Sequence, residues 1–287
     1  MWAQLLFWLK VSRPGLWFAT VWLYVLPTSQ MEVAHSVPFW FGFFYVCFPL
    51  NFLVYGWNDI VDREVDAQNP RKDSFLFGAG GRLEQLKELW KPILVVQLLT
   101  YPFLLWWGGW PMLLLLILLL IINALYNWPD KGLRSSPPWE LLCQFGYILI
   151  VPLSMVLNQT PLLPWPTFVY LLLFAVQSHL MGEVMDVEPD RRSGRRTTAT
   201  QIGVRKTKLL IIAIVLTEVL ILFWVFEEYI FGGMLALGLL WLLLDLFIIF
   251  KTKQYTLWQM QLFGVMSNVV AVASMTYVWY SGCLLAI

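Results

Sequence analysis

Long apolar segments separated by short polar connections make up most of the chain. A helix that crosses the hydrocarbon core of a membrane needs about 20 mainly apolar residues. The apolar segments therefore predict nine spanning helices, at residues 14–31, 37–58, 90–107, 110–127, 138–158, 164–184, 208–226, 229–250 and 258–284. The pattern predicts an all-α integral membrane protein, with these helices in one domain covering residues 1–287.

Two of the connections are so short that they predict helical hairpins. Gly108 and Gly109, followed by Pro111, separate the third and fourth segments, and residues of this kind form tight turns. The seventh and eighth segments meet in the same way at Glu227 and Glu228. We therefore expect each of these pairs of segments to pack as antiparallel neighbours.

The composition agrees with a membrane protein and excludes several other classes. Hydrophobic residues make up 59% of the chain and charged residues 13%, whereas a soluble domain has about 25% charged residues. The net charge of +1 gives no reason to expect a nucleic acid partner. Three cysteines lie singly in apolar segments, so they predict packing residues instead of disulfides or a zinc site. We expect no cleavable signal or transit peptide, which favours a bacterial or archaeal membrane.

The basic residues lie on one side of the predicted membrane. With nine spans, the N-terminus and every second connection share one side, and together they contain all 19 Lys and Arg residues. Basic residues concentrate in cytoplasmic loops of membrane proteins. We therefore expect a multi-pass protein of the inner (cytoplasmic) membrane whose N-terminus and charged loops face the cytoplasm. A missing or extra helix would scatter these charges over both sides.

A cluster of acidic residues follows the second apolar segment, in the stretch NDIVDREVD. Asp59, Asp62 and Asp66 are spaced i, i+3 and i+7, so they share one face if the helix continues, and Asn58 lies on an overlapping stripe. Like charges at this spacing repel each other, and more strongly near lipid. A cation bound between these carboxylates would remove the repulsion.

A second acidic cluster, GEVMDVEPDRRSGRR, ends the sixth apolar segment on the same side. It contains Glu183, Asp186, Glu188 and Asp190, and the two aspartates share a helix face at i and i+4. Such clusters can be solvated helix ends with no further role. Two of them, each at the end of a membrane helix and each followed by basic residues, favour a shared site.

The residues in and after the clusters suit a ligand with a phosphate head and an apolar tail. Carboxylate oxygens are ligands for Mg²⁺, which usually bridges a few carboxylates to substrate phosphates. Basic side chains suit phosphate oxygens, and here they are Arg71, Lys72, Arg191, Arg192, Arg195 and Arg196. At the mouth of an apolar helix bundle, this chemistry fits an isoprenyl diphosphate.

The two clusters resemble the motifs of a known family. NDIVDREVD resembles the N-D-x-x-D-x-x-x-D motif of the UbiA-type intramembrane prenyltransferases, and DVEPDRRSGRRTTAT resembles their D-x-E-x-D-x-x-x-G-x-x-T motif. The pair Arg13 and Pro14 also resembles the start of their first helix. The resemblance implies a helix bundle around a central cavity open to lipid. It further implies Mg²⁺-dependent transfer of a prenyl group to a lipophilic acceptor such as a quinone-precursor aromatic, a pigment or a carotenoid.

One loop departs from the common family pattern. Many members have Y-x-x-x-K between the fourth and fifth helices, whereas here one extra residue separates Tyr126 from Lys131, and Arg134 follows. This segment is closer to the Tyr-x-x-Pro pattern of members that act on large pigments or carotenoids. NPRK, residues 69–72, and the TTAT after the second motif resemble the carotenoid-elongating branch in the same way. Whether Lys131 or Arg134 contacts the diphosphate is left open.

The resemblance assigns roles to residues of both motifs. It implies that the metal ligands and catalytic carboxylates are Asp59, Asp62, Asp66, Asp186 and Asp190. The candidates for contact with the diphosphate are Arg13, Asn58, Arg71, Lys72, Lys131, Arg134, Arg195 and Arg196. The positions of four more residues make them candidates for substrate contact: Asn51, on the stripe of Asn58; His179, on the face of Asp186; and two aromatic residues near the motifs, Tyr55 and Tyr126. For His179, contact with the acceptor, a role as a base and a structural hydrogen bond are all left open.

Three functions are compatible with these features. A prenyltransferase uses an acceptor, and a terpene cyclase on the same fold ionises the same substrate without one. A lipid-diphosphate transporter or binding protein is the alternative from another class. Transporters typically have interrupted helices and charged residues near the membrane midplane. Here most acids cluster at one face, although Glu218 and Asp245 lie within apolar segments, where ionisable groups are often functional.

Overall fold

The computed structural model describes residues 2–66, 71–80, 83–128 and 132–285, and this part of the chain is helical without a strand. The α-helices are α1 (Trp2–Val11), α2 (Trp17–Val25), α3 (Val37–Cys47), α4 (Pro49–Asp66), α5 (Leu83–Lys87), α6 (Trp90–Asn127), α7 (Trp139–Leu142), α8 (Phe145–Ile148), α9 (Ile150–Asn158), α10 (Trp165–Arg192), α11 (Thr198–Ile202), α12 (Val204–Trp224), α13 (Tyr229–Leu244) and α14 (Leu257–Ser281). A π-helical turn, η4 (Asp245–Ile249), continues α13.

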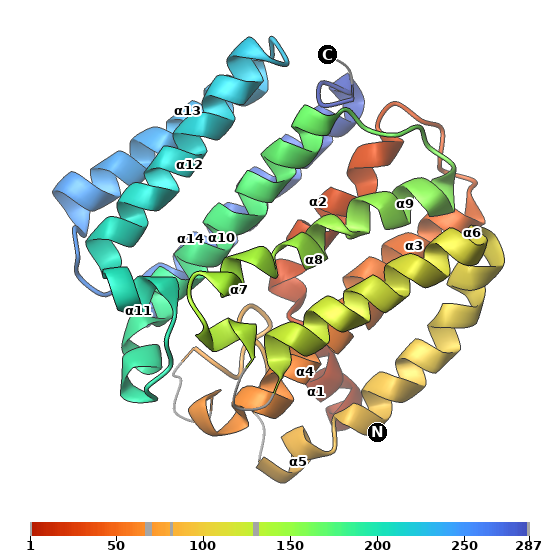
Figure 1. Cartoon of the computed structure of the whole chain (residues 1–287), viewed down its shortest axis with the longest axis horizontal. Coiled ribbons are helices and arrows are strands. Elements are labelled where there is room, and N and C mark those ends of the chain that lie inside the picture. The colour runs from red at the N-terminus through yellow and green to blue at the C-terminus, as the bar shows by residue number, and fades with distance from the viewer. Residues whose placement is uncertain (1, 67–70, 81–82, 129–131, 286–287) are drawn as a thin grey trace.

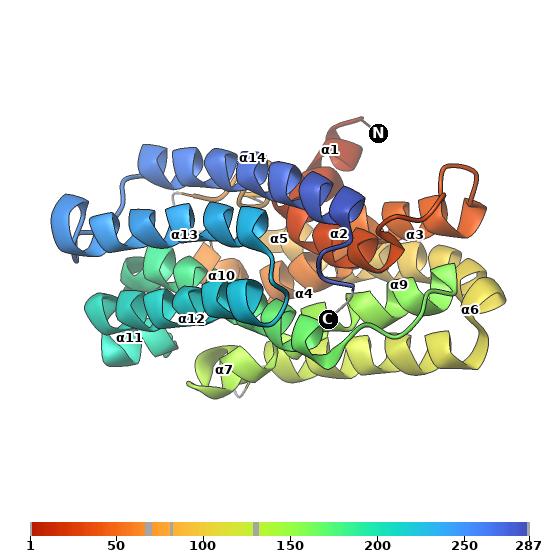
Figure 2. The ribbon, with the colours of Figure 1, turned by 90° about the horizontal axis from the view of Figure 1, so that it is seen from above.

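The long helices run side by side in a bundle with two halves (Figures 1 and 2). In one half α10 packs against α12, and α12 against α13. In the other half α4 packs against α6, and α9 packs against α2, α3 and α6. Helices suit a membrane because they satisfy every backbone hydrogen bond within one segment. The apolar pattern along the chain is therefore sufficient to explain the fold class.

Seven stretches within the described residues are long and apolar enough to cross a membrane: 37–64, 84–127, 139–158, 165–192, 204–224, 229–249 and 257–281. The protein is a multi-pass membrane protein, and the predicted all-α class is confirmed. The predicted count of nine is not reproduced as such. One stretch contains two of the predicted spans, and the first predicted span is too short to be among the seven.

The third and fourth predicted spans form one hairpin within α6. Gly109 has φ 57° and ψ −145°, which is not helical, and the chain reverses there (Figure 1). Glycine populates positive φ readily, whereas other residues do so at a cost. The first predicted span is regular only over α2, because 3₁₀ turns at Pro14–Leu16 and Leu26–Thr28 flank it. Each of these turns contains a proline, which limits the α-helix on both sides.

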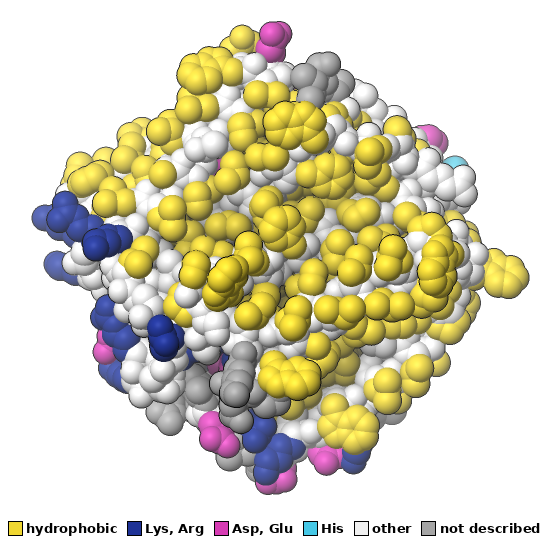
Figure 3. Space-filling view, in the orientation of Figure 1, with side chains coloured by type: hydrophobic (Ala, Val, Ile, Leu, Met, Phe, Trp, Pro, Cys, Tyr) yellow, Lys and Arg dark blue, Asp and Glu magenta, His cyan; other side chains and the backbone are white. Residues whose placement is uncertain are grey.

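The exposed side chains separate into an apolar surface and a charged edge. Hydrophobic side chains cover most of the face seen in Figure 3, and Lys and Arg gather along its lower-left and lower margin. Many large apolar side chains are exposed, among them Trp106, Leu99, Leu237 and Val265. A surface of this kind is stable only against lipid or another protein. The ends of α4 and α10 that carry the acidic motifs lie at the charged margin (Figure 1).

Candidate active site

The first acidic motif is helical throughout, because α4 continues past the predicted end of its span to Asp66. Asp59 and Asp62 are 1% and 3% exposed. Arg13 Nη2 donates to Asp59 Oδ1 at 2.7 Å, and Lys72 Nζ donates to the same oxygen at 2.8 Å. Lys72 Nζ also lies 2.7 Å from Asp66 Oδ2. Burial raises the pKa of Asp66, and the Lys72 ammonium partly offsets this shift.

Arg13 reaches Asp59 from the corner between α1 and the first 3₁₀ turn. Its backbone is left-handed, with φ 52°, and Pro14 follows directly. The guanidinium carbon lies 4.4 Å from the centre of the Tyr55 ring, and Tyr147 donates a hydrogen bond to the Tyr55 hydroxyl at 3.4 Å. Burial alone would lower the pKa of Arg13, but Asp59, Tyr55 and Asp66 together raise it. The guanidinium is therefore a fixed positive charge at the start of the bundle.

Asp62 connects the first motif to two other loops. Its Oδ1 lies 3.1 Å from Arg134 Nε, in the connection between α6 and α7, and its Oδ2 lies 3.1 Å from Arg195 Nη1, after α10. Asn58 Nδ2 donates to the same Oδ2 at 3.0 Å. Arg195 Nη1 is also 3.9 Å from Asp190 Oδ1. Arg195 therefore bridges the two acidic motifs, whose similar positions at the ends of membrane helices had favoured a shared site.

Another carboxylate of the second motif is paired with a basic residue from the loop after α4. Asp186 forms an ion pair with Arg71, whose guanidinium carbon is 4.8 Å from the centre of the Phe77 ring. A cavity of about 70 Å³ lies beside this pair, and Gln254, Tyr255 and Leu257 also line it. The loop after α4, the end of α10 and the start of α14 therefore meet at one place.

The charged side chains of the cluster are arranged as ion pairs and not as a group of metal ligands. Within the described ranges, no group of three or more His, Cys, Asp or Glu side chains is close enough to hold a metal ion. The carboxylates face Arg and Lys side chains instead. The fit to Mg²⁺ rests on their hard oxygen donors and on Asp59 Oδ2, which is buried without a hydrogen-bond partner.

The basic side chains of the cluster also have hydrogen-bond donors without partners. Arg13 Nε, Arg134 Nη1 and Arg195 Nε are buried donors with no hydrogen-bond partner. Buried polar groups without partners are rare and costly in proteins. In this cluster, one buried carboxylate oxygen and three buried guanidinium nitrogens therefore lack hydrogen-bond partners. Such groups fit a site that binds a cation together with an anion.

Comparison with known proteins agrees with this geometry. The sequence model of the UbiA prenyltransferase family matches residues 15–269. The chain belongs to the UbiA prenyltransferase family. The resemblance inferred from the acidic motifs is thereby confirmed, and the protein is an enzyme of the prenyltransferase class.

Curated relatives of this UbiA-family chain are carotenoid enzymes. It is 27% identical over 181 residues to a lycopene elongase/hydratase of Haloarcula japonica, an alignment that covers 58% of this chain and 55% of that relative. It is 24% identical over 221 residues to the lycopene elongase/hydratase of Corynebacterium glutamicum, covering 73% of this chain and 74% of the relative.

Solved structures of UbiA homologues share the fold. A homologue from Archaeoglobus fulgidus bound to DMAPP and Mg²⁺ has a TM-score of 0.69 and 17% identity, over 94% of this chain and 97% of that one. The same homologue bound to GPP and Mg²⁺ has a TM-score of 0.67 and 17% identity, over 94% and 97% of the two chains. At this identity the likeness shows the UbiA fold.

Not every predicted site residue of this UbiA-family enzyme lies in the cluster. The predicted substrate contact of Asn51 is corrected, because its side chain is bound within the protein. Its side-chain nitrogen donates to Thr20 Oγ1 at 2.9 Å and to the carbonyl of Val46 at 2.8 Å. The helix begins only at Pro49, so Asn51 lies in its first turn, where it satisfies the last carbonyls of α3. Arg196 is exposed outside the buried cluster. Lys131 lies outside the described residues.

His179 and Tyr126 lie beside the second motif. The rings of Tyr126 and His179 meet edge to face, with 6.3 Å between their centres. His179 Nε2 is 3.2 Å from Glu183 Oε1. Both rings therefore lie beside the second motif, and their contact with substrate stays a prediction.

Three polar residues that were not among the predicted site residues form hydrogen bonds next to the cluster. Asn127 Oδ1 accepts from Asn58 Nδ2 at 3.3 Å. Glu140 accepts from the backbone and the hydroxyl of Thr198, at 2.8 and 2.6 Å. Glu183, grouped only with the acidic run, accepts from the Ala199 nitrogen at 2.9 Å. These contacts anchor the TTAT segment, and the signal that could have indicated Glu140 is its place inside an apolar span.

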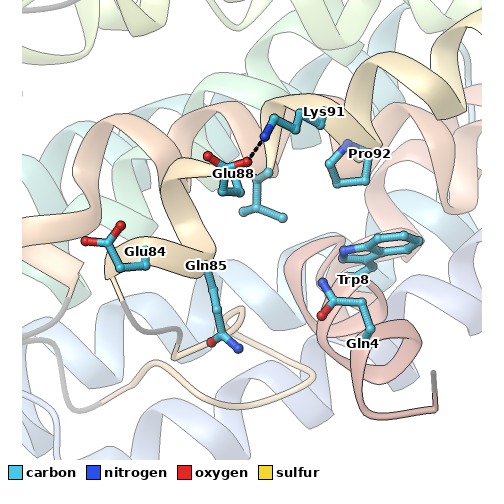
Figure 4. Close-up of a pocket in the computed structure, with 8 residues that line it drawn as sticks. Gln4, Trp8, Glu84, Gln85, Glu88, Lys91 and Pro92 are labelled. Carbon is cyan, nitrogen blue, oxygen red and sulfur yellow. Dashed lines mark hydrogen bonds and ion pairs between the residues drawn. The ribbon is translucent and has the colours of Figure 1, made fainter.

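A larger hollow of about 400 Å³ lies elsewhere, between α1 and the junction of α5 and α6 (Figure 4). Trp8 and Gln4 line it on one side, and Glu88 and Lys91, which form an ion pair, line it on the other. It contains none of the motif residues. The candidate active site is therefore the charged cluster, not this hollow.

Proposed function

We propose that the enzyme transfers a prenyl group from an isoprenyl diphosphate to a lipophilic acceptor within the membrane, with Mg²⁺ as cofactor. The observation that carries this proposal is the buried cluster in which Asp62 and Asp190 from two distant helices meet at Arg195. We further propose that the cluster faces the cytoplasm from an inner membrane, because the basic residues gather at the same margin.

Ligand binding would exchange the partners within the cluster. The side chains that would hold Mg²⁺ are Asp59, Asp62, Asp66, Asp186 and Asp190. The basic and amide side chains released in this exchange would bind the diphosphate: Arg13, Asn58, Arg71, Lys72, Arg134 and Arg195, with Lys131 and Arg196 as further candidates. When bound, Mg²⁺ supplies positive charge that neutralises the leaving diphosphate.

The chain's own residues contribute charge, position and exclusion of water. Arg13 and Arg195 keep their charge in a low-dielectric surrounding, because Asp59 and Asp62 raise their pKa against the effect of burial. Once the diphosphate is bound, fixed charges of this kind stabilise the leaving group as its bond breaks. The ring of Tyr55 lies under the Arg13 guanidinium, next to the place where the allylic cation would form, and aromatic faces stabilise cations.

A long polyene is the acceptor class that the chain favours. The relatives named lycopene elongase/hydratase support this choice. The segment from Tyr126 to Arg134 supports it as well, since it departs from the Y-x-x-x-K pattern. The structures of homologues bound to DMAPP and GPP with Mg²⁺ support an allylic diphosphate as donor.

The proposal is tested with purified protein, a series of isoprenyl diphosphates, and polyene, quinone-precursor and chlorophyllide acceptors, with products identified by mass spectrometry. We expect EDTA to stop diphosphate release and Mg²⁺ to restore it. Release unaffected by EDTA would contradict the metal assignment. Prenylated acceptor is expected; a cyclised prenyl product without acceptor would instead identify a cyclase.

A matched pair of variants tests the site itself. Asp62→Asn removes a buried carboxylate that binds two arginines, and we expect at least a 100-fold loss of turnover. Glu64→Gln changes an acid of the same motif that is 78% exposed, and it should retain activity. Equal activity of the two variants would exclude the cluster as the active site.

A further inference from the structure

The hollow between α1 and the junction of α5 and α6 has the size of a ligand pocket. Its volume is about 400 Å³, and ligand pockets usually have about 300–1,000 Å³. Its lining combines the apolar side chains of Trp8, Leu89 and Pro92 with charged side chains from residues 84–91 (Figure 4). A ligand that fits it would therefore carry both apolar and charged groups.

The hollow lies at the charged margin of the molecule, where we expect the membrane surface. α5 and the start of α6 are at the lower margin in Figure 1, and Figure 3 shows charged side chains there next to the apolar face. Trp2, at the start of α1, and Trp90, at the start of α6, are 76% and 54% exposed. Tryptophan concentrates at the boundary between lipid headgroups and hydrocarbon. A membrane lipid that enters the hollow would therefore place its headgroup among the charges.

An exposed apolar stripe on α6 leads from the hollow toward the hydrocarbon region. Counting from Pro92, the stripe contains Val95, Leu99 and Phe103 at i+3, i+7 and i+11, which share one helix face. These three residues are 54%, 65% and 52% exposed. At a rise of 1.5 Å per residue the stripe is about 16 Å long, and half of the hydrocarbon core is about 15 Å thick. It therefore offers an acyl chain a path through one leaflet.

The charges in and beside the hollow balance each other. Glu88 forms an ion pair with Lys91, and Glu84 Oε1 lies 3.6 Å from Lys87 Nζ. All four side chains are more than half exposed. Exposed ion pairs contribute little to stability, so a ligand can replace one partner by another at little cost. Two acids and two bases suit a headgroup that carries both signs of charge.

Trp8 supplies a hydrogen-bond donor for the anionic part of such a headgroup. Its Nε1 is buried and has no hydrogen-bond partner among the described residues. The indole N–H can only donate, and a buried donor without a partner is costly. A phosphate oxygen would satisfy this donor, and Lys91, which lines the same hollow, would add its charge.

We propose that the hollow binds a membrane phospholipid whose headgroup carries a primary amine, of the phosphatidylethanolamine type. Its ammonium binds Glu84 and Glu88. Its phosphate binds Lys91 and the Trp8 indole, and one acyl chain lies along the stripe on α6. An ammonium group has three N–H donors for carboxylates, whereas a choline headgroup has no N–H. Binding does not depend on the proposed function, because the described residues that line the hollow include none from the acidic motifs.

Photo-crosslinking tests the proposal on the intact protein in nanodiscs of dioleoylphosphatidylcholine. The probes are trace amounts of phosphatidylethanolamine and of phosphatidylcholine, each with the same diazirine-bearing acyl chain. Mass spectrometry of peptides locates the labelled residues. We expect labelling between Pro92 and Phe103, about tenfold stronger with the ethanolamine probe, because charge-assisted hydrogen bonds are the strong ones. Unlabelled phosphatidylethanolamine should displace this probe, and the same amount of phosphatidylglycerol should not.

Two variants separate the parts of the headgroup. The double variant Glu84→Gln, Glu88→Gln should lose the preference for ethanolamine over choline, because the ammonium no longer meets carboxylates. Trp8→Phe keeps an aromatic ring and removes the donor, so labelling by both probes should fall about threefold to tenfold with their ratio unchanged. Glu32→Gln and Trp106→Phe, which change exposed residues outside the hollow, are the matched controls and should behave as wild type.

Four results would overturn the proposal. They are equal labelling of the 92–103 segment by the two probes in the wild-type protein, a full ethanolamine preference in the double variant, unchanged labelling in Trp8→Phe, and displacement by phosphatidylglycerol at least as strong as by phosphatidylethanolamine. The last result would show an anionic-lipid site formed by the lysines. The comparison of probes in the wild-type protein needs no variant, so it decides even where a variant fails to fold.

Discussion

A buried ion pair outside the two acidic motifs allows a quantitative test of the structure. Lys208 on α12 and Asp245 at the start of η4 are 2% and 3% exposed, and Lys208 Nζ lies 2.5 Å from Asp245 Oδ2. The Tyr255 hydroxyl donates to both carboxylate oxygens at 2.9 Å. Lys208 Nζ also donates to the carbonyl of Lys251 at 3.0 Å. The four residues join α12 to the connection that precedes α14.

Removing one partner should cost much more than removing both. A single substitution, Lys208→Met or Asp245→Leu, leaves the other charge buried, and such losses cost about 3–5 kcal/mol. The remaining contacts of Lys208 with the Lys251 carbonyl and the Tyr255 ring, 4.6 Å away, favour the lower end of this range for Asp245→Leu. The double variant replaces the pair by apolar side chains of similar size, so it should lie within about 1–2 kcal/mol of wild type.

Equilibrium unfolding in mixed micelles with increasing SDS, followed by circular dichroism, measures these differences. A cost of about 3 kcal/mol corresponds to a change of about 100-fold in the unfolding constant, since 1.4 kcal/mol is tenfold. Lys253→Met, at an exposed lysine of the same connection, is the control and should be neutral. Single variants within about 1 kcal/mol of wild type, or a double variant that costs the sum of both singles, would refute the reasoning.

Three further predictions follow from other contacts. Arg134→Gln should raise the KM for the diphosphate about tenfold in steady-state assays, whereas Lys131→Gln should raise it less, because Arg134 binds Asp62 in the cluster; equal KM values in both variants and wild type would remove this loop from the site. Tyr55→Leu should raise the same KM a few-fold and Tyr55→Phe should not, since the ring faces the Arg13 guanidinium; identical effects would exclude a role for the ring. Gly42→Ala should lower stability by about 1–3 kcal/mol in SDS unfolding, because its methyl group would overlap the Tyr24 ring and Leu157; an unchanged midpoint would contradict this packing.

The features that local pattern determines were predictable from the sequence. Apolar segments of membrane length gave the all-α class, and the spacing of Asp59, Asp62 and Asp66 placed them on one helix because α4 continues through them. Helical periodicity is sufficient for such statements. The hairpin at Gly109 was also predictable, since the turn residues are local signals.

The partners of each charge were not predictable. Arg134 and Arg195 bind the same aspartate from two connections that are far apart in the chain, and only tertiary packing brings them together. The prediction for Asn51 was wrong for a related reason. Helical spacing places Asn51 on the same face of α4 as Asn58, but in the first turn of α4 its side chain binds the free carbonyls at the end of α3. Sequence periodicity places a residue on a face and does not say what covers that face.

The gathering of the charged cluster at one margin of the bundle has an electrical consequence. Under the proposed function, the diphosphate arrives and leaves at the same margin, and the prenyl chain that enters the hydrocarbon region is uncharged. Moving one elementary charge through a membrane potential costs about 2.3 kcal/mol per 100 mV, but turnover here carries no charge from one compartment to the other. The enzyme should therefore work at the same rate in energised and de-energised vesicles, which separates its chemistry from the bioenergetic state of the membrane that holds it.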